Sequence, residues 1–210
     1  MAGSASILTD DSQLSRLDIH LYRIEKFLAL VSGIAVFFLM LLAVVSVGGR
    51  NLFNHPLQGY VDWIEQVMPL IAFMGIAYTQ RDGGHIRMDI LVGRLKGRAL
   101  YVIEFITTLA VLILMVLLVW GSWAHFDRSF DFSAPMWSRD SSMDIALPIW
   151  PTKLLVPIAF SVLCLRLCLQ IWAFAHAIVT GIKHPIAVPR IEDAATLAAK
   201  EAKHVSGRDT

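Results

Sequence analysis

Residues 27–49, FLALVSGIAVFFLMLLAVVSVGG, contain no charged side chain. An α-helix needs about 20 apolar residues to cross the hydrocarbon core of a bilayer, so this stretch predicts a transmembrane helix. Three further apolar runs of similar length follow, at about residues 61–79, 99–124 and 154–179. The sequence therefore predicts an all-α integral membrane protein with four transmembrane helices.

The composition of the chain agrees with this class. Charged residues make up 17% of the 210 residues, against about 25% in an ordinary soluble domain, and the mean hydropathy is +0.62. The net charge is only +1, and the basic residues are spread through loops rather than gathered on one stripe. Nucleic acid is therefore not an expected partner, whereas membrane lipid is.

Basic residues beside the spans predict how the chain is oriented. Ten of them fall on one side: Arg16, Arg23, Lys26, Arg81, Arg87, Arg94, Lys96, Arg98, Lys183 and Arg190. Four fall on the other: Arg50, Arg128, Arg139 and Lys153. We therefore expect both termini in the cytoplasm, with residues 1–26 as an N-terminal segment, 27–180 as the transmembrane domain and 181–210 as a cytoplasmic tail.

The N-terminal segment has its own helical pattern. Apolar residues recur at spacings of three and four, at Leu14, Leu17, Leu21, Ile24 and Leu28. This periodicity is typical of an amphipathic helix. We expect that helix to lie on the membrane surface or to pack on neighbouring spans.

Charged residues inside the spans are candidates for a structural or functional role, because burying charge in lipid is costly. Arg50 follows the first span and Glu65 lies about one turn inside the second, so the two are expected to pair across adjacent helices. The alternative is that either charge meets a second subunit or an ion path. Arg166 lies near the middle of the fourth span and is expected to pair within the bundle or with a partner protein. Glu104, in the first turns of the third span, is the remaining charge of this kind.

No pattern of catalytic or metal-binding residues emerges from the sequence. A transmembrane haem needs two histidines at similar depth, but His125 and His176 fall at opposite ends of their spans. The chain also has no H-E-x-x-H, C-x-x-C or glycine-rich phosphate motif. We therefore expect no catalytic residue, cofactor or metal, and no enzymatic activity.

Four short motifs, taken together, resemble the small membrane subunit of tripartite ATP-independent periplasmic (TRAP) transporters, the DctQ-type subunit. They are GRNLFN at residues 49–54, WIE at 63–65, GIA at 75–77 and RDGGHIRMD at 81–89. The motifs cover under a quarter of the chain, and the predicted four-helix layout matches the family over the rest. A longer third loop, ending in LPIWPTK at 147–153, departs from compact members and leaves the solute open.

The resemblance implies a subunit of the bacterial inner membrane without its own substrate site. In this family a periplasmic solute-binding protein captures a solute, often a carboxylate such as a C4-dicarboxylate or 2-oxo acid. It delivers the solute to a large permease subunit driven by a sodium gradient. The small subunit binds the large one, extends its static scaffold and helps to dock the binding protein.

The family motifs fall on Arg50, Glu65, Arg81, His85 and Asp89, which the resemblance assigns to fold and interface. An Asp–His or Asp–Arg network among the last three residues is expected to fix the loop after the second span, with a solvated loop as the alternative. Two other classes remain open: a membrane anchor of a respiratory or redox enzyme, and an independent four-helix exporter. The first would carry haem or quinone, and the second would transport solute by itself.

Overall fold

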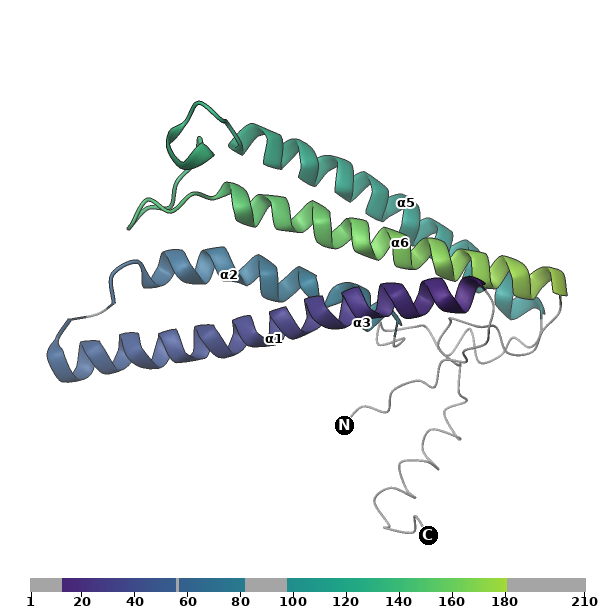
Figure 1. The fold of residues 1–210 in the computed structure, drawn as a ribbon, viewed down its shortest axis with the longest axis horizontal. Coiled ribbons are helices and arrows are strands. Elements are labelled where there is room, and N and C mark those ends of the chain that lie inside the picture. The colour runs from purple at the N-terminus through teal and green to yellow at the C-terminus, as the bar shows by residue number, and fades with distance from the viewer. Residues whose placement is uncertain (1–12, 56, 82–97, 181–210) are drawn as a thin grey trace, which may run out of the picture.

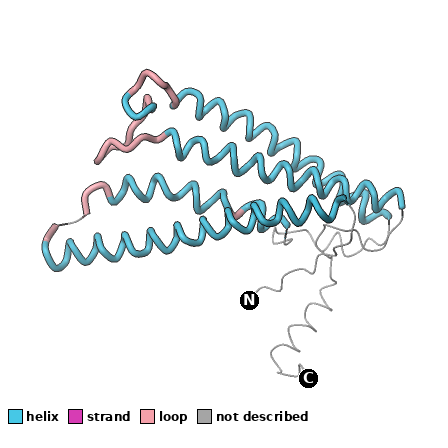
Figure 2. Tube along the Cα trace, in the orientation of Figure 1, coloured by secondary structure: helices cyan, strands magenta, loops and turns pink. Residues whose placement is uncertain are grey.

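The computed structural model describes residues 13–55, 57–81 and 98–180 of the chain, and its secondary structure is helical (Figures 1 and 2). The helices are α1 (Gln13–Phe53), α2 (Tyr60–Met74), α3 (Ile76–Arg81), α5 (Arg98–Ser129), a short 3₁₀ helix η1 (Pro135–Trp137) and α6 (Trp150–Thr180). The expectation of an all-α protein is confirmed.

The helices form two antiparallel pairs, α1 with α2 and α5 with α6. The pairs meet where α1 begins and α6 ends, which we call the terminal end (Figure 1). They diverge toward the opposite end, the loop end, which carries residues 54, 55, 57–59 and 130–149. Helix α6 lies at the centre, because it contacts α1, α2, α3 and α5 and contributes more buried side chains than any other described helix.

Two small apolar clusters hold α6 to its neighbours. Ala77 of α3 packs with Leu163 and Leu167 of α6, and nearer the terminal end Phe174 of α6 packs against Leu14 and other partly buried residues. Burying apolar side chains such as these stabilises the bundle by about 25 cal/mol for each Å² removed from solvent. Both clusters join α6 to the α1–α3 side of the molecule.

Helix α1 is a single helix of 41 residues, about 60 Å long at roughly 1.5 Å per residue. Residues 13–26 are thus helical, but they continue into the first span instead of forming the separate surface helix that we expected. The inward face of the helix also differs from the expected one, because Leu17 and Ile24 are each 48% exposed. The side of the helix that packs inward is instead formed by Leu14, Asp18, Leu21, Glu25 and Leu28.

The predicted second span is divided at Gly75, between α2 and α3. The carbonyl of Gly75 accepts hydrogen bonds from both the backbone N–H and the hydroxyl of Thr79, each 3.0 Å long. A hydroxyl that bonds back to the preceding turn commonly bends a helix, and Pro69 removes one further backbone donor inside α2. Together α2 and α3 run from Tyr60 to Arg81, about 33 Å.

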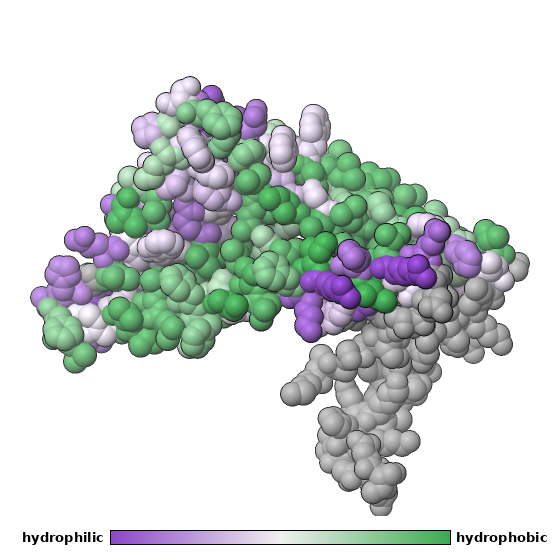
Figure 3. Space-filling view, viewed as in Figure 1, coloured by the Kyte–Doolittle hydropathy of each residue, from purple (hydrophilic) through white to green (hydrophobic). Residues whose placement is uncertain are grey.

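Three described helices are long and apolar enough to cross a membrane: Gln13–Phe53, Ala99–Ser129 and Trp150–Thr180. The α2–α3 pair does not qualify as one continuous helix, so the count of four spans stays a prediction. Figure 3 shows a broad apolar surface between polar side chains at the two ends of the visible face. This distribution suits a bundle that is surrounded by hydrocarbon over its middle.

Candidate functional site: a buried ion cluster and a clamped loop

Four charged side chains meet inside the bundle, and we call them the ion cluster: Asp18 and Glu25 of α1, Arg81 of α3 and Arg166 of α6. Arg166 and Glu25 are 0% exposed and Asp18 is 1% exposed. Because two carboxylates face two guanidinium groups, the cluster is formally neutral. Charge balance of this kind is what allows ionised groups to remain inside an apolar bundle.

Arg166 is the centre of the cluster. Its Nε and Nη2 donate to the two carboxylate oxygens of Glu25, both at 2.6 Å, and its Nη1 donates to Asp18. The paired contact with Glu25 is the parallel, two-bond geometry that makes Arg–carboxylate pairs strong and directional. The structure therefore pairs Arg166 within the bundle, between α6 and the first turns of α1.

Arg81 completes the cluster from the end of α3. Its Nη2 donates to Asp18 at 2.7 Å, and its guanidinium lies 3.9 Å from the centre of the Tyr22 ring. The Tyr22 ring stacks in turn on Tyr78, with 6.1 Å between ring centres. Next to Arg81 in the sequence, the side-chain amide of Gln80 donates a hydrogen bond of 2.9 Å to the side-chain oxygen of Gln170 in α6. Polar and aromatic contacts thus tie α1, α3 and α6 together at the terminal end.

At the loop end, Asp62 in the first turn of α2 holds the loop that connects η1 to α6. Its carboxylate accepts hydrogen bonds from the Ser142 hydroxyl at 2.6 Å and from the backbone N–H groups of Ile145 and Asp144 at 2.8 and 3.1 Å. The carboxylate is only 2% exposed. We call this arrangement the Asp62 clamp.

Gly59 allows α2 to begin at the clamp. It has φ +71°, a left-handed conformation that glycine adopts without cost and other residues avoid. A Cβ atom at this position would lie 2.5 Å from the side chain of Ile145. Both the backbone angle and the close approach of the loop therefore require glycine.

Aromatic rings cover the loop end of the α5–α6 pair. Phe130 lies 4.8 Å from Phe132 and 5.4 Å from Trp150, measured between ring centres, and Trp137 lies 6.4 Å from Phe132. Edge-to-face contacts at these distances add to the stability that burial provides. We expect the cluster either to sit at the membrane boundary or to offer a surface to a partner protein.

Two carboxylates of this loop have pKa values below the ordinary 3.8. The Lys153 ammonium, 2.6 Å away, and the Ser129 hydroxyl lower the pKa of Asp140. The backbone N–H of Ser133 and the guanidinium of Arg139 lower that of Asp131. Because each folded pKa is depressed, each group stabilises the loop above its unfolded pKa and loses that contribution as the pH falls through the folded value.

Acidification is therefore expected to loosen the loop below about pH 3.8, with little change between pH 5 and 8. The emission of Trp137 and Trp150 reports on this loop, and comparison with the single variants Trp137→Phe and Trp150→Phe isolates their signal. A transition centred near pH 6 would contradict the assignment to these carboxylates.

Arg50 and Glu65, expected to pair, are both exposed, and within the described residues no ion pair joins them. Arg50 lies in the last turn of α1, whereas Glu65 lies in the second turn of α2. The clamp uses Asp62, a different acidic residue of α2. The expected pair is therefore not formed in the described residues, and the alternative, contact with a second subunit or an ion path, stays a prediction.

Arg50→Ala and Glu65→Ala are accordingly expected to act independently in the isolated chain. Their effects on the free energy of unfolding should add to within about 0.5 kcal/mol in a double-mutant cycle. Unfolding by sodium dodecyl sulfate, followed by circular dichroism, measures this. A coupling energy above about 1 kcal/mol would show that the two side chains interact.

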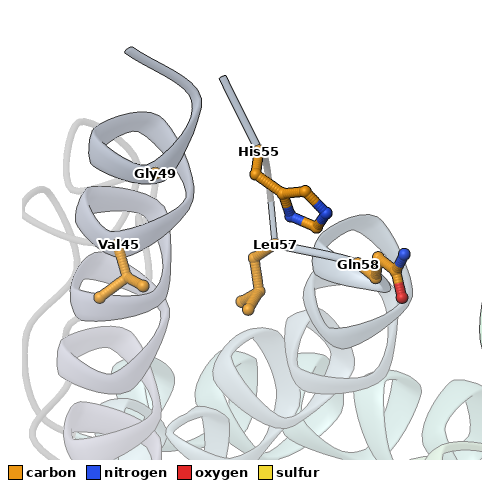
Figure 4. Close-up of a pocket in the computed structure, with 5 residues that line it drawn as sticks. All are labelled: Val45, Gly49, His55, Leu57 and Gln58. Carbon is orange, nitrogen blue, oxygen red and sulfur yellow. The ribbon is translucent and has the colours of Figure 1, made fainter. Parts of the chain in front are cut away.

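The remaining candidates from the sequence are Glu104, His85 and Asp89. Glu104 is buried on α5, while His85 and Asp89 lie outside the described residues. No group of three or more His, Cys, Asp or Glu residues within the described ranges is arranged to hold a metal ion. One open hollow of about 350 Å³ lies at the loop end, lined by Val45, Gly49, His55, Leu57 and Gln58 (Figure 4).

Asp18, Glu25 and Asp62 are site residues that the sequence motifs did not indicate. A signal for the first two was present, because both interrupt the heptad-like series that begins at Leu14 and ends at Leu28. An acidic residue on an apolar helix face requires a buried partner. Asp62 had no comparable signal, since an acidic residue in the first turn of a helix is common.

A protein-family model described as "Tripartite ATP-independent periplasmic transporters, DctQ component" matches residues 27–176. A comparison with curated proteins gives no match. The family match includes Arg81 and Arg166, whereas their partners Asp18 and Glu25 precede it. The ion cluster therefore joins the region shared with the family to the N-terminal extension of α1.

Proposed function

The chain belongs to the DctQ-component family of tripartite ATP-independent periplasmic transporters, and from this premise we propose that it is the small scaffold subunit of a sodium-coupled solute importer. It assembles with a large permease subunit in the bacterial inner membrane and helps to dock a periplasmic solute-binding protein. The family match over residues 27–176 is the observation that carries this proposal.

The architecture of the chain suits a scaffold. A static support needs helices that keep their relative positions, and the ion cluster links α1, α3 and α6 through charged hydrogen bonds with no water-exposed member except part of Arg81. At the other end, the Asp62 clamp fixes the long loop on α2. Rigid elements of this kind hold a binding surface in one orientation.

We place the loop end in the periplasm and both termini in the cytoplasm, on the basis of the basic residues beside the spans. In this orientation the loop of residues 130–149 faces the binding protein. Arg50 and Glu65, exposed near the same end, are our candidates for contact with the large subunit. Arg81 and Arg166 then have a structural role, and His85 and Asp89 are proposed to support the loop that follows α3.

The solute class rests on the family resemblance, and we propose a carboxylate such as a C4-dicarboxylate or a 2-oxo acid. Transport is assigned to the large subunit, so the small subunit performs no catalysis and binds no cofactor or metal. The family match favours this account over a membrane anchor for a redox enzyme and over an independent exporter.

Reconstitution tests the proposal. The chain, its large subunit and its binding protein are placed in proteoliposomes, and uptake of a radiolabelled C4-dicarboxylate or 2-oxo acid is measured with and without an inward sodium gradient. We expect uptake only when all three proteins and the gradient are present. Transport by this chain alone would support the exporter, and a haem absorbance band in the purified chain would support the redox anchor.

A further inference from the structure

The first turns of α1 carry acidic and basic residues that the fold separates onto different faces. Asp18 and Glu25 are buried against Arg81 and Arg166, so their negative charge is neutralised inside the bundle. The three basic residues of the same segment are exposed, and within the described part of the chain none of them forms an ion pair or a hydrogen bond: Arg16, Arg23 and Lys26. The sequence suggests a mixed-charge segment, whereas the folded helix presents a positive face that no acidic side chain of residues 13–55, 57–81 or 98–180 neutralises.

These basic residues form a continuous feature, which we call the basic stripe. At about 100° per residue, Arg16 and Arg23 lie within about 20° of each other around the helix, with Lys26 about 60° further round. The exposed His20 lies on the same side. Figure 3 shows hydrophilic side chains gathered over the beginning of α1, next to the apolar surface.

Large apolar side chains flank the stripe and are also exposed. Leu17 and Ile24 lie on one side of it, Ile19 lies within it at an angle between those of Arg23 and Lys26, and Phe27 begins the uncharged run. A helix face that alternates basic and large apolar residues is typical of the interface between lipid headgroups and acyl chains. A soluble acidic partner would satisfy the charges but would leave these apolar groups without a matching environment.

We propose that the basic stripe binds the headgroups of anionic phospholipids. Arg23 and Lys26 lie within about 6 Å of Phe27, where the uncharged run of α1 begins, and we take this point as the start of the hydrocarbon. Because Glu25 lies between them and bonds Arg166, Arg166 then lies near the headgroup layer and not at the middle of the membrane. Their cationic side chains contact the phosphates, and the neighbouring apolar side chains insert between the upper parts of the acyl chains. Arg16 lies about 10 Å further along α1 than Arg23, near the limit over which the surface potential of the membrane acts.

The ion cluster makes this binding possible, because it removes the two carboxylates that would repel an anionic headgroup. It also fixes the rotation of α1 about its own axis, so that the stripe faces outward along the whole segment. Anionic lipid bound there ties the beginning of α1 to the headgroup layer. This inference depends on membrane insertion of the chain and not on the identity of its transport partners.

Native mass spectrometry of the full chain in detergent tests the proposal with two lipid probes, phosphatidylglycerol and phosphatidylcholine. The wild-type chain is expected to bind phosphatidylglycerol more tightly than phosphatidylcholine. Each basic residue near an anionic surface contributes about fivefold to binding, so Arg23→Gln/Lys26→Gln should lower the apparent affinity for phosphatidylglycerol by about tenfold or more. Adding Arg16→Gln should lower it further.

The matched control is Arg128→Gln, which removes an exposed charge at the loop end and is expected to change this affinity less than twofold. Soluble glycerol phosphate should not displace the lipid, because the apolar flanks require acyl chains. Equal binding of the two lipids, unchanged binding by the Arg23/Lys26 variant, or displacement by glycerol phosphate would overturn the proposal. The proposal would also be overturned if the Arg23→Gln/Lys26→Gln variant kept its bound lipid but lost the large subunit during purification.

Discussion

Arg166→Leu is expected to destabilise the chain more than any other single substitution in the bundle. The change removes both hydrogen bonds to Glu25 and the bond to Asp18, and it leaves a buried carboxylate without a counter-charge. Removing one partner of a buried ion pair typically costs about 3–5 kcal/mol. The free energy of unfolding in sodium dodecyl sulfate, followed by circular dichroism, should fall by this amount.

A second substitution distinguishes loss of charge balance from loss of packing. In Arg166→Leu/Glu25→Leu the remaining Asp18 and Arg81 still neutralise each other, so the double variant should regain part of the stability lost in Arg166→Leu. Arg166→Lys keeps the charge but loses the two-bond geometry, and it should fall between wild type and Arg166→Leu. Arg128→Leu, at an exposed position of α5, serves as the control and should have little effect.

An Arg166→Leu chain as stable as wild type would contradict the role given to the ion cluster. A double variant that loses more stability than the two single variants combined would also contradict it, because the second substitution would then create a new defect. Since Arg166 is 0% exposed within the chain, any loss of assembly with a large subunit should follow from the loss of stability.

Gly59→Ala has the second largest expected effect, at the opposite end of the molecule. A left-handed backbone costs a residue with a Cβ about 1–2 kcal/mol, and the new methyl would lie 2.5 Å from the Ile145 side chain. Relieving such overpacking typically costs a further 1–3 kcal/mol or so. The loop should therefore move away from α2 and weaken the Asp62 clamp.

Limited trypsin digestion at the exposed Arg139 measures release of this loop, and we expect faster cleavage in Gly59→Ala than in wild type. Asp62→Asn should show the same direction of change, because a neutral amide is a weaker acceptor for the three donors of the loop. Gly121→Ala is the matched control, since Gly121 lies in α5 with no atom within 4 Å of its added Cβ. Cleavage of Gly59→Ala at the wild-type rate would show that the loop does not depend on the close approach at Gly59.

The helical class followed from the sequence because an uncharged run such as 27–49 has few alternatives in water or lipid. The interruption at Gly75 did not follow from the sequence. It depends on Thr79 donating both its backbone N–H and its hydroxyl to the carbonyl of Gly75. The orientation of the α1 face was also missed: Leu17 and Ile24 fit a spacing of three or four as well as the true buried positions do. Only contact with α6 decides between the two faces.

The site likewise contains one residue that the sequence indicated and others that it did not. Arg166 could be singled out because a charge within a long apolar run demands a counter-charge. Its partners Asp18 and Glu25 lie more than a hundred residues away in the sequence, and no local pattern identifies such a pairing. The Asp62 clamp depends on a loop conformation that includes left-handed residues such as Ala146, which spacing alone does not reveal.

The central claim is that this chain is the small subunit of a TRAP transporter and works as a rigid partner of a large permease. Purification of the tagged chain from its native membrane in a mild detergent, with mass spectrometry of the proteins that accompany it, tests the claim most directly. We predict recovery of one large multi-span permease in a stable ratio to the chain. Recovery of the chain alone, or with a haem or quinone enzyme, would contradict the account.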